Sequence, residues 1–164
     1  IKDIKSFKQP RSIIFLYEPK SKTTLDSILD DVSRLATCHL SACSHTPIII
    51  NGPSLNNSEI VTDYGQIIEN YRASLKEKAV MIIKNLERVP GQSAQAFHSF
   101  CDTYNPVVEN ALFLFTLEIN ALPKEYPIKF LENFLLTLWN DLGRDDKFYP
   151  LFTRISETIL LVRS

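Results

Sequence analysis

Residues 12–24 read SIIFLYEPKSKTT, and this stretch decides the fold class. The apolar run at 12–17 predicts a short, fully buried strand, which Glu18-Pro19 closes. Thr23 or Thr24 is then predicted to cap a helix. The apolar face of that helix consists of Leu25, Ile28, Leu29, Val32, Leu35 and Ala36. A buried strand followed directly by an amphipathic helix indicates an α/β fold.

The same alternation continues along the chain. Further apolar runs predict strands at 47–51, 79–83, 111–119 and 158–162. Helical patterns lie between them at 60–75, 96–101, 128–142 and 148–156, and Gly143 is the predicted C-cap of the third. The strand segments are continuous apolar runs rather than alternating ones, which is typical of parallel strands covered on both faces. We therefore expect a three-layer α/β domain with a central, mostly parallel sheet flanked by helices.

Length and composition narrow the function classes. The 164 residues fit one domain, 1–164, in which residues 1–11 form an edge or a flexible lead-in. The net charge is −1 and no basic stretch is dense, so we expect no nucleic-acid partner. No apolar run is long enough to span a bilayer and no signal peptide is present. Any membrane attachment is therefore expected through a transmembrane segment outside this fragment.

The cysteines and one asparagine carry information on the compartment. Cys38 and Cys43 are close enough for a local disulfide in an oxidising compartment, although free buried thiols fit equally well, and Cys101 has no obvious partner. Asn56 begins an Asn-Asn-Ser glycosylation sequon, which weakly favours the secretory pathway. The histidines and cysteines do not have the spacing of metal ligands, so no metal site is predicted.

The turn after the first strand is where a parallel sheet of this kind would bind phosphates. A phosphate loop needs glycines, a lysine and a hydroxyl. Lys22-Thr23 matches the end of that pattern, but a proline and a glutamate stand where the glycines belong, and the whole chain has four glycines. A solvated turn and helix cap is the favoured interpretation, and a divergent phosphate loop is the alternative.

The end of the third strand lacks the expected acids as well. A hydrolysing enzyme of this layout places carboxylates there to hold magnesium, whereas this chain has Lys84-Asn85. Glu87 follows later, and a surface ion pair with Arg88 or a structural hydrogen bond is its predicted role.

Arg154 is the remaining candidate. It lies in the segment 151–156 (LFTRIS), where Leu151, Phe152 and Ile155 fit the buried face of a short helix, so Arg154 should project toward an edge of the domain. A rigidly held guanidinium can stabilise the charge on a transferring phosphate, but composition alone favours a surface salt bridge.

Several segments resemble a known family in order and spacing. They are 51–54 (NGPS), 79–90 (AVMIIKNLERVP), 100–118 and 151–156 (LFTRIS), within residues 12–162. Together they resemble the luminal domain of the torsin-activating proteins, the lamina-associated polypeptide and torsin-interacting protein family.

The resemblance implies a degenerate AAA+-like domain that binds no nucleotide or other cofactor and is no enzyme itself. Such domains lie in the lumen of the endoplasmic reticulum or the perinuclear space, in membrane-anchored proteins. They bind ATP-loaded torsin in a hetero-oligomeric ring or dimer and stimulate ATP hydrolysis. Arg154 matches the arginine finger acting in trans, and Glu87 matches a position important for the interface or for local structure.

Two alternatives remain open. One is a nucleotide-binding, P-loop-like enzyme whose phosphate loop has diverged, and Lys22 and Thr23 are its only support. The other is an adaptor that tethers torsin without activating it.

Overall fold

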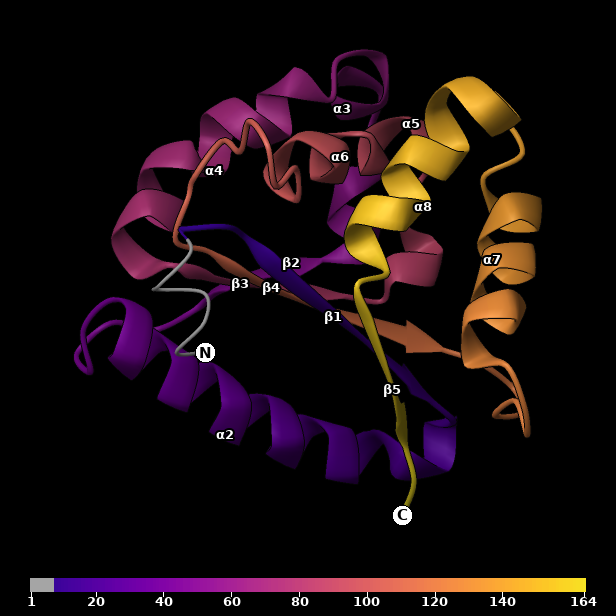
Figure 1. The fold of residues 1–164 in the computed structure, drawn as a ribbon, viewed down its shortest axis with the longest axis horizontal. Coiled ribbons are helices and arrows are strands. Elements are labelled where there is room, and N and C mark those ends of the chain that lie inside the picture. Colours follow the sequence, from indigo (N-terminus) through magenta and orange to yellow (C-terminus); the bar gives the residue numbers. More distant parts are fainter. Residues whose placement is uncertain (1–7) are drawn as a thin grey trace.

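The computed structural model describes residues 8–164. Within them the chain forms one sheet of five parallel strands in the order β2-β3-β4-β1-β5 (Figure 1). The strands are β1 (Arg11–Tyr17), β2 (Ile48–Asn51), β3 (Val80–Lys84), β4 (Leu112–Glu118) and β5 (Thr158–Val162). The sheet is thus parallel throughout its described length, and the prediction of a mostly parallel sheet is confirmed. Arg11 opens β1 and pairs with Leu112, while residues 1–7 of the predicted lead-in lie outside the described part.

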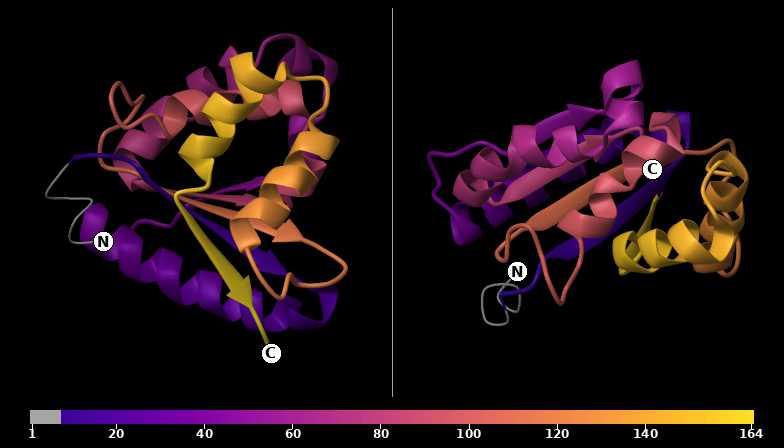
Figure 2. Two further views of the ribbon diagram at one scale, coloured as in Figure 1. Left: turned by 45° about the vertical axis from the view of Figure 1, so that its right-hand side comes forward. Right: turned by 90° about the horizontal axis from the view of Figure 1, so that it is seen from above.

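Helices cover both faces of the sheet (Figures 1 and 2). The long helix α2 (Lys22–Leu40) lies across one face. The other face carries α3 (Ser58–Thr62), α4 (Gly65–Lys78), α5 (Gly91–Ala94), α6 (Ala96–Phe100), α7 (Pro127–Leu138) and α8 (Tyr149–Ile155). Short helical turns lie between the strands and helices, namely η1 (Pro19–Ser21), η2 (Gly52–Leu55), η3 (Leu86–Arg88) and the π-helical η4 (Arg144–Phe148). The predicted three layers are confirmed.

Strand β1 explains why its sequence is a continuous apolar run. Its side chains alternate between the two faces, because successive residues of a strand point to opposite sides. Ile14 and Leu16 pack into the large cluster beneath the many helices. Phe15 and Tyr17 pack into the smaller cluster beneath α2. Both sides are therefore dry, and β1 needs apolar residues at nearly every position.

Helix boundaries differ from the predicted ones in three places. Helix α2 starts at Lys22, so Thr23 and Thr24 lie inside its first turn instead of capping it. The predicted helix 60–75 is divided into α3 and α4 at Asp63, whose carboxylate accepts a hydrogen bond from the backbone of Gly65 at 3.0 Å. A local side-chain-to-backbone bond of this kind competes with the helical ladder.

The helix predicted at 128–142 ends earlier, at Leu138. The next residue, Trp139, is 1 % exposed, and its indole N–H donates to the carbonyl of Val89 at 2.8 Å. That bond ties the end of α7 to the segment after β3. Gly143 is not the C-cap, because its φ of −60° is outside the left-handed region, and it precedes η4 instead.

Gly52 marks the closest approach between two segments of the carboxyl edge. A Cβ atom at this position would lie 2.2 Å from the carbonyl oxygen of Asn85 and 2.9 Å from that of Lys84. Both are backbone atoms, which cannot rotate away. The turn after β2 therefore packs against the turn after β3 only because residue 52 has no side chain.

We expect Gly52→Ala to lower the free energy of unfolding by about 2 kcal/mol or more, because the added methyl forces the two turns apart. Urea denaturation followed by circular dichroism measures the change. Gly143→Ala is the matched control, since its Cβ would meet only a side-chain atom of Asp146 at 3.5 Å. An equal loss in both variants would contradict the close-approach explanation.

Candidate functional site

Arg154 lies at the edge of the sheet formed by the amino ends of the strands. It belongs to α8, which leads directly into β5, and β5 runs parallel to β1. The buried hydroxyl of Ser12, near the start of β1, can donate to the carbonyl oxygens of Arg154 and Ile155, each at 3.1 Å. The end of α8 is thus fastened to the amino end of the central strand.

Arg154 lies on α8, which is held in place by its buried residues. Leu151, Phe152 and Ile155 are buried, as the sequence predicted, and the ring of Phe152 stacks on Phe148 with 5.7 Å between centroids. The Arg154 side chain is half-buried, and its Nη1 donates to the carbonyl of Pro150 at 2.8 Å. Among residues 8–164 this is its one protein hydrogen bond, so most of the guanidinium remains available for another group.

A cavity of about 470 Å³ opens beside Arg154. Its wall includes Arg11 and Glu157, which form an ion pair, together with Asp102 and Tyr104 from the segment after α6. These residues come from the start of β1, the segment after α6 and the end of α8. The salt bridge expected for Arg154 from composition does not form within residues 8–164, where Glu157, on the wall of the same cavity, pairs with Arg11.

The Asp102 carboxylate is fixed by its own loop. The backbone N–H of Tyr104 donates to its Oδ1 at 2.9 Å, and that of Asn105 donates to the same atom at 3.3 Å. These bonds, the Tyr104 one foremost, and the nearby charge of Arg154 hold the pKa of Asp102 below its usual range. Asp102 is therefore an anion at neutral pH.

Two further groups lie close to this region. Burial, and secondarily the charge of Arg154, lowers the pKa of His98, which keeps its imidazole neutral at neutral pH. Cys101 is buried, and its burial raises the pKa of the thiol. A buried neutral thiol is a poor nucleophile, so Cys101 adds no obvious catalytic function.

At the opposite edge, the turn after β1 is built around a carboxylate. Glu18 Oε1 accepts a hydrogen bond from the backbone of Leu122 at 2.9 Å, and Lys20 lies 3.3 Å from Glu18 Oε2. The Leu122 bond, followed by the contact with Lys20, holds the pKa of Glu18 below its usual range. Lys22 pairs with Asp26 at 3.2 Å. An anion thus occupies the turn where a phosphate would have to lie, and the lysine of the partial motif is engaged elsewhere.

Glu87 has a structural hydrogen bond at the same edge. It accepts from the side-chain amide of Asn85 at 2.9 Å, and no ion pair with Arg88 forms in the described part of the chain. Asn85 has a left-handed backbone, with φ of 61°, and its N–H donates to Thr116 at 2.9 Å. Of the two roles predicted for Glu87, the structural hydrogen bond is therefore the one the geometry contains.

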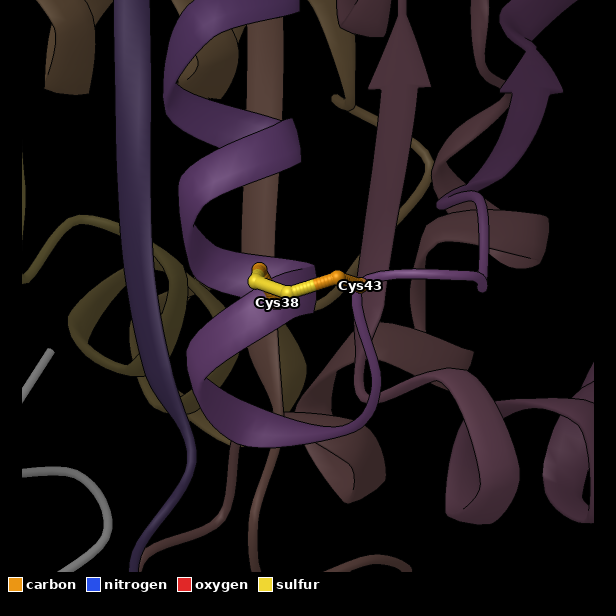
Figure 3. The surroundings of a disulfide bond; sticks show 2 residues. All are labelled: Cys38 and Cys43. Carbon is orange, nitrogen blue, oxygen red and sulfur yellow. A yellow bond between two sulfur atoms is a disulfide. The ribbon is translucent and has the colours of Figure 1, made fainter.

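Cys38 and Cys43 form a disulfide at the end of α2 (Figure 3). The bridge joins the last turns of the helix to the loop that leads to β2. Asn56, the sequon residue, is exposed in the turn before α3. The side-chain oxygen of the neighbouring Asn57 accepts a hydrogen bond from the backbone N–H of Ile60 at 3.0 Å and caps α3. Asn56 itself remains exposed to solvent.

Residues 8–164 lack two features. They contain no group of three or more histidine, cysteine or acidic side chains arranged to hold a metal ion. No helix among them has both the length and the hydropathy needed to cross a bilayer.

Comparisons with known proteins support the fold. No protein-family model matches the chain. A 162-residue alignment with the replicase polyprotein 1ab of Alphamesonivirus 1 has 23% identity and covers 93% of this chain but 3% of the polyprotein. The solved closed state of the AAA+ ATPase Hsp104 with ATPγS and FITC casein superposes with a TM-score of 0.56 and 12% identity, over 94% of this chain and 29% of that one. The chain therefore has an AAA+-like fold, and it spans only a small part of either protein.

Sequence reasoning identified Arg154 but missed its surroundings. Ser12, Arg11 and Glu157 reach the site through contacts between distant parts of the chain, for which the sequence holds no local signal. Asp102 could have been found, because an aspartate three residues before Asn105-Pro106 is typical of a side-chain-stabilised turn.

The cysteine arrangement predicts a definite thiol count. Without reductant, the native protein should give almost no fast reaction with Ellman's reagent, because Cys101 is buried. Denaturation alone should expose one thiol per chain, and reduction followed by denaturation should expose three, the full cysteine content. Three thiols before reduction would contradict the Cys38–Cys43 bridge.

Proposed function

We propose that this domain is a non-catalytic activator of a torsin-family AAA+ ATPase, to which it supplies Arg154 as an arginine finger in trans. The observation that carries the proposal is the position of Arg154 at the amino edge of the sheet. Strand β1 has seven residues. At about 3.3 Å per residue, the two edges of the sheet are therefore separated by about 20 Å.

This separation excludes action on a ligand of the same chain at the carboxyl edge. The guanidinium of an arginine side chain reaches far less than 20 Å, and a finger must contact the transferring phosphate directly. Arg154 can meet a phosphate only on another molecule that docks against the amino edge. Its partly unpaired guanidinium and the packed base of α8 suit that role, since a finger must be held in place without being neutralised.

The carboxyl edge supports the non-catalytic half of the proposal. The Glu18 carboxylate in the turn after β1 would repel a phosphate, and Lys84 would repel a magnesium ion at the end of β3. An AAA+-like fold without the charges for its own ATP fits a partner that completes another protein's site. We infer that selectivity for the ATP state arises because the finger gains a contact only when the γ-phosphate is present.

The compartment belongs to the same proposal. The Cys38–Cys43 bridge is favoured by an oxidising environment, and Asn56 is exposed as an acceptor of a glycan must be. Both support the lumen of the endoplasmic reticulum or the perinuclear space, with the domain held there by a membrane anchor outside this fragment.

Arg154→Ala should abolish stimulation of torsin while the fold is retained, because α8 packs through residues on its other side. A finger supplied in trans accelerates phosphoryl transfer by about 10³- to 10⁵-fold in well-studied systems, so stimulated hydrolysis should fall to the level of torsin alone. Steady-state ATPase rates at saturating domain concentration provide the measurement.

Arg72→Ala is the matched control, because it removes the same charge from an exposed position on α4. It should stimulate as the wild type does. Arg154→Lys tests geometry, since an ammonium keeps the charge but loses the planar fork, and it should recover only a small part of the stimulation. Normal stimulation by Arg154→Ala would show that the finger assignment is wrong. No stimulation by the wild type, together with binding, would favour the tethering adaptor.

The second candidate is a nucleotide-binding enzyme with a divergent phosphate loop. Lys22 and Thr23 at the start of α2, and the likeness to an ATPase fold, are the observations in its favour. Our proposal predicts no measurable heat when MgATP at up to about 1 mM is titrated into the isolated domain, because Glu18 opposes phosphate binding. Binding in the micromolar range that Lys22→Ala removes would instead favour the enzyme.

A further inference from the structure

The cavity beside Arg154 is lined by two guanidinium groups, those of Arg11 and Arg154, and by two carboxylates, those of Asp102 and Glu157. Arg11 and Glu157 neutralise one another across its wall. Arg154 lines the same cavity as Asp102, and its charge lowers the pKa of the Asp102 carboxyl, yet the two side chains form no ion pair. Asp102 therefore has a neighbour of opposite charge but no direct side-chain partner among residues 8–164.

Docking would upset this balance. When the guanidinium of Arg154 contacts a phosphate, its charge is shared with that phosphate and is no longer available to the cavity. Two carboxylates, those of Asp102 and Glu157, then face the single guanidinium of Arg11. In that state the cavity has a net negative charge, which favours the entry of a cation.

We propose that the cavity receives an arginine or lysine side chain of the ATP-loaded partner, which pairs with Asp102 while Arg154 contacts the partner's phosphate. The proposal rests on the activator function proposed above and names a second contact of the same interface. The two contacts are reciprocal, because each protein places a cationic side chain in an anionic site of the other.

The dimensions and the rim of the cavity fit such an occupant. Its volume of about 470 Å³ exceeds that of one side chain, so a protruding loop can carry the cation in. Tyr104 is at the rim and is 96% exposed, far more than a tyrosine that packs against its own domain. A ring in that position can cover an entering cation with its face. The Asp102 loop holds both groups, because Asp102 binds the backbone of Tyr104.

The carboxylates also decide against an anionic occupant. A partner's aspartate or a free phosphate could contact Arg154, but it would bring a negative charge close to Asp102 and Glu157. A neutral side chain would leave Asp102 unpaired. Of the three classes, only a cation improves the charge balance of the docked cavity.

Asp102→Asn tests this contact with little change in shape. The asparagine Oδ1 can still accept from the backbone of Tyr104 and Asn105, so the loop keeps its conformation while the charge is removed. Binding to a hydrolysis-deficient torsin loaded with ATP is measured by calorimetry or biolayer interferometry. We expect the dissociation constant to rise about tenfold, and Asp102→Lys to raise it further by repulsion.

The ATPase assay separates this contact from the finger. Asp102→Asn should raise the domain concentration needed for half-maximal stimulation, while the maximal stimulated rate is retained once the partner is saturated. Arg154→Ala should instead remove the maximal rate. Tyr104→Ala should weaken binding in the same direction as Asp102→Asn. The loss caused by Asp102→Asn should shrink at high salt, because salt screens the ion pair, whereas the loss caused by Tyr104→Ala should not.

Asp31→Asn is the control, because Asp31 is an exposed carboxylate on α2, on the other face of the sheet. It should bind as the wild type does. An unchanged dissociation constant and half-maximal concentration for Asp102→Asn would overturn the cavity proposal while leaving the Arg154 function intact. A wild-type domain that does not bind ATP-loaded torsin would overturn both.

Discussion

Parallel strand pairing is the constraint on which this molecule depends. Because β1, β4 and β5 run in the same direction, all their amino ends meet at one edge and all their carboxyl ends at the other. The carboxyl edge is the usual ligand site of such sheets, and here it is closed by Glu18 and by the packing of Gly52 on the turn after β3. The amino edge carries Arg154. The same pairing therefore places the usual ligand site of the fold at one edge of the sheet and the half-buried guanidinium of Arg154 at the other.

Much of this fold could be predicted from the sequence because its strands are buried on both faces. Residues 13–17 face apolar clusters on the two sides of the sheet, and their continuous run of apolar and aromatic residues is a strong local signal. The helix ends were less predictable. Helix α7 ends before Trp139, whose indole N–H donates to Val89, a residue 50 positions away. No sequence pattern near Gly143 predicts this contact. Asp63 divides the predicted helix 60–75 by a side-chain contact that competes with helical pairing.

The candidate site, too, could be predicted from the sequence only in part. Arg154 could be located on its helix because Leu151, Phe152 and Ile155 have helical spacing. The surroundings of Arg154 could not be predicted, because Ser12 meets Ile155 across 143 positions of sequence and Arg11 pairs with the distant Glu157. Tertiary contacts of this kind decide whether a guanidinium is paired or available. In place of the surface ion pair that composition alone favoured, they leave Arg154 largely unpaired beside a cavity.

The central claim is that Arg154 meets a phosphate on a partner rather than one in its own chain. A cryo-EM structure of the domain bound to torsin trapped with ATP tests it most directly. The account predicts the guanidinium of Arg154 at about 3 Å from an oxygen of the partner's γ-phosphate, with the amino edge of this sheet at the interface. A complex in which Arg154 faces solvent, or in which the Glu18 turn surrounds the nucleotide, would contradict it.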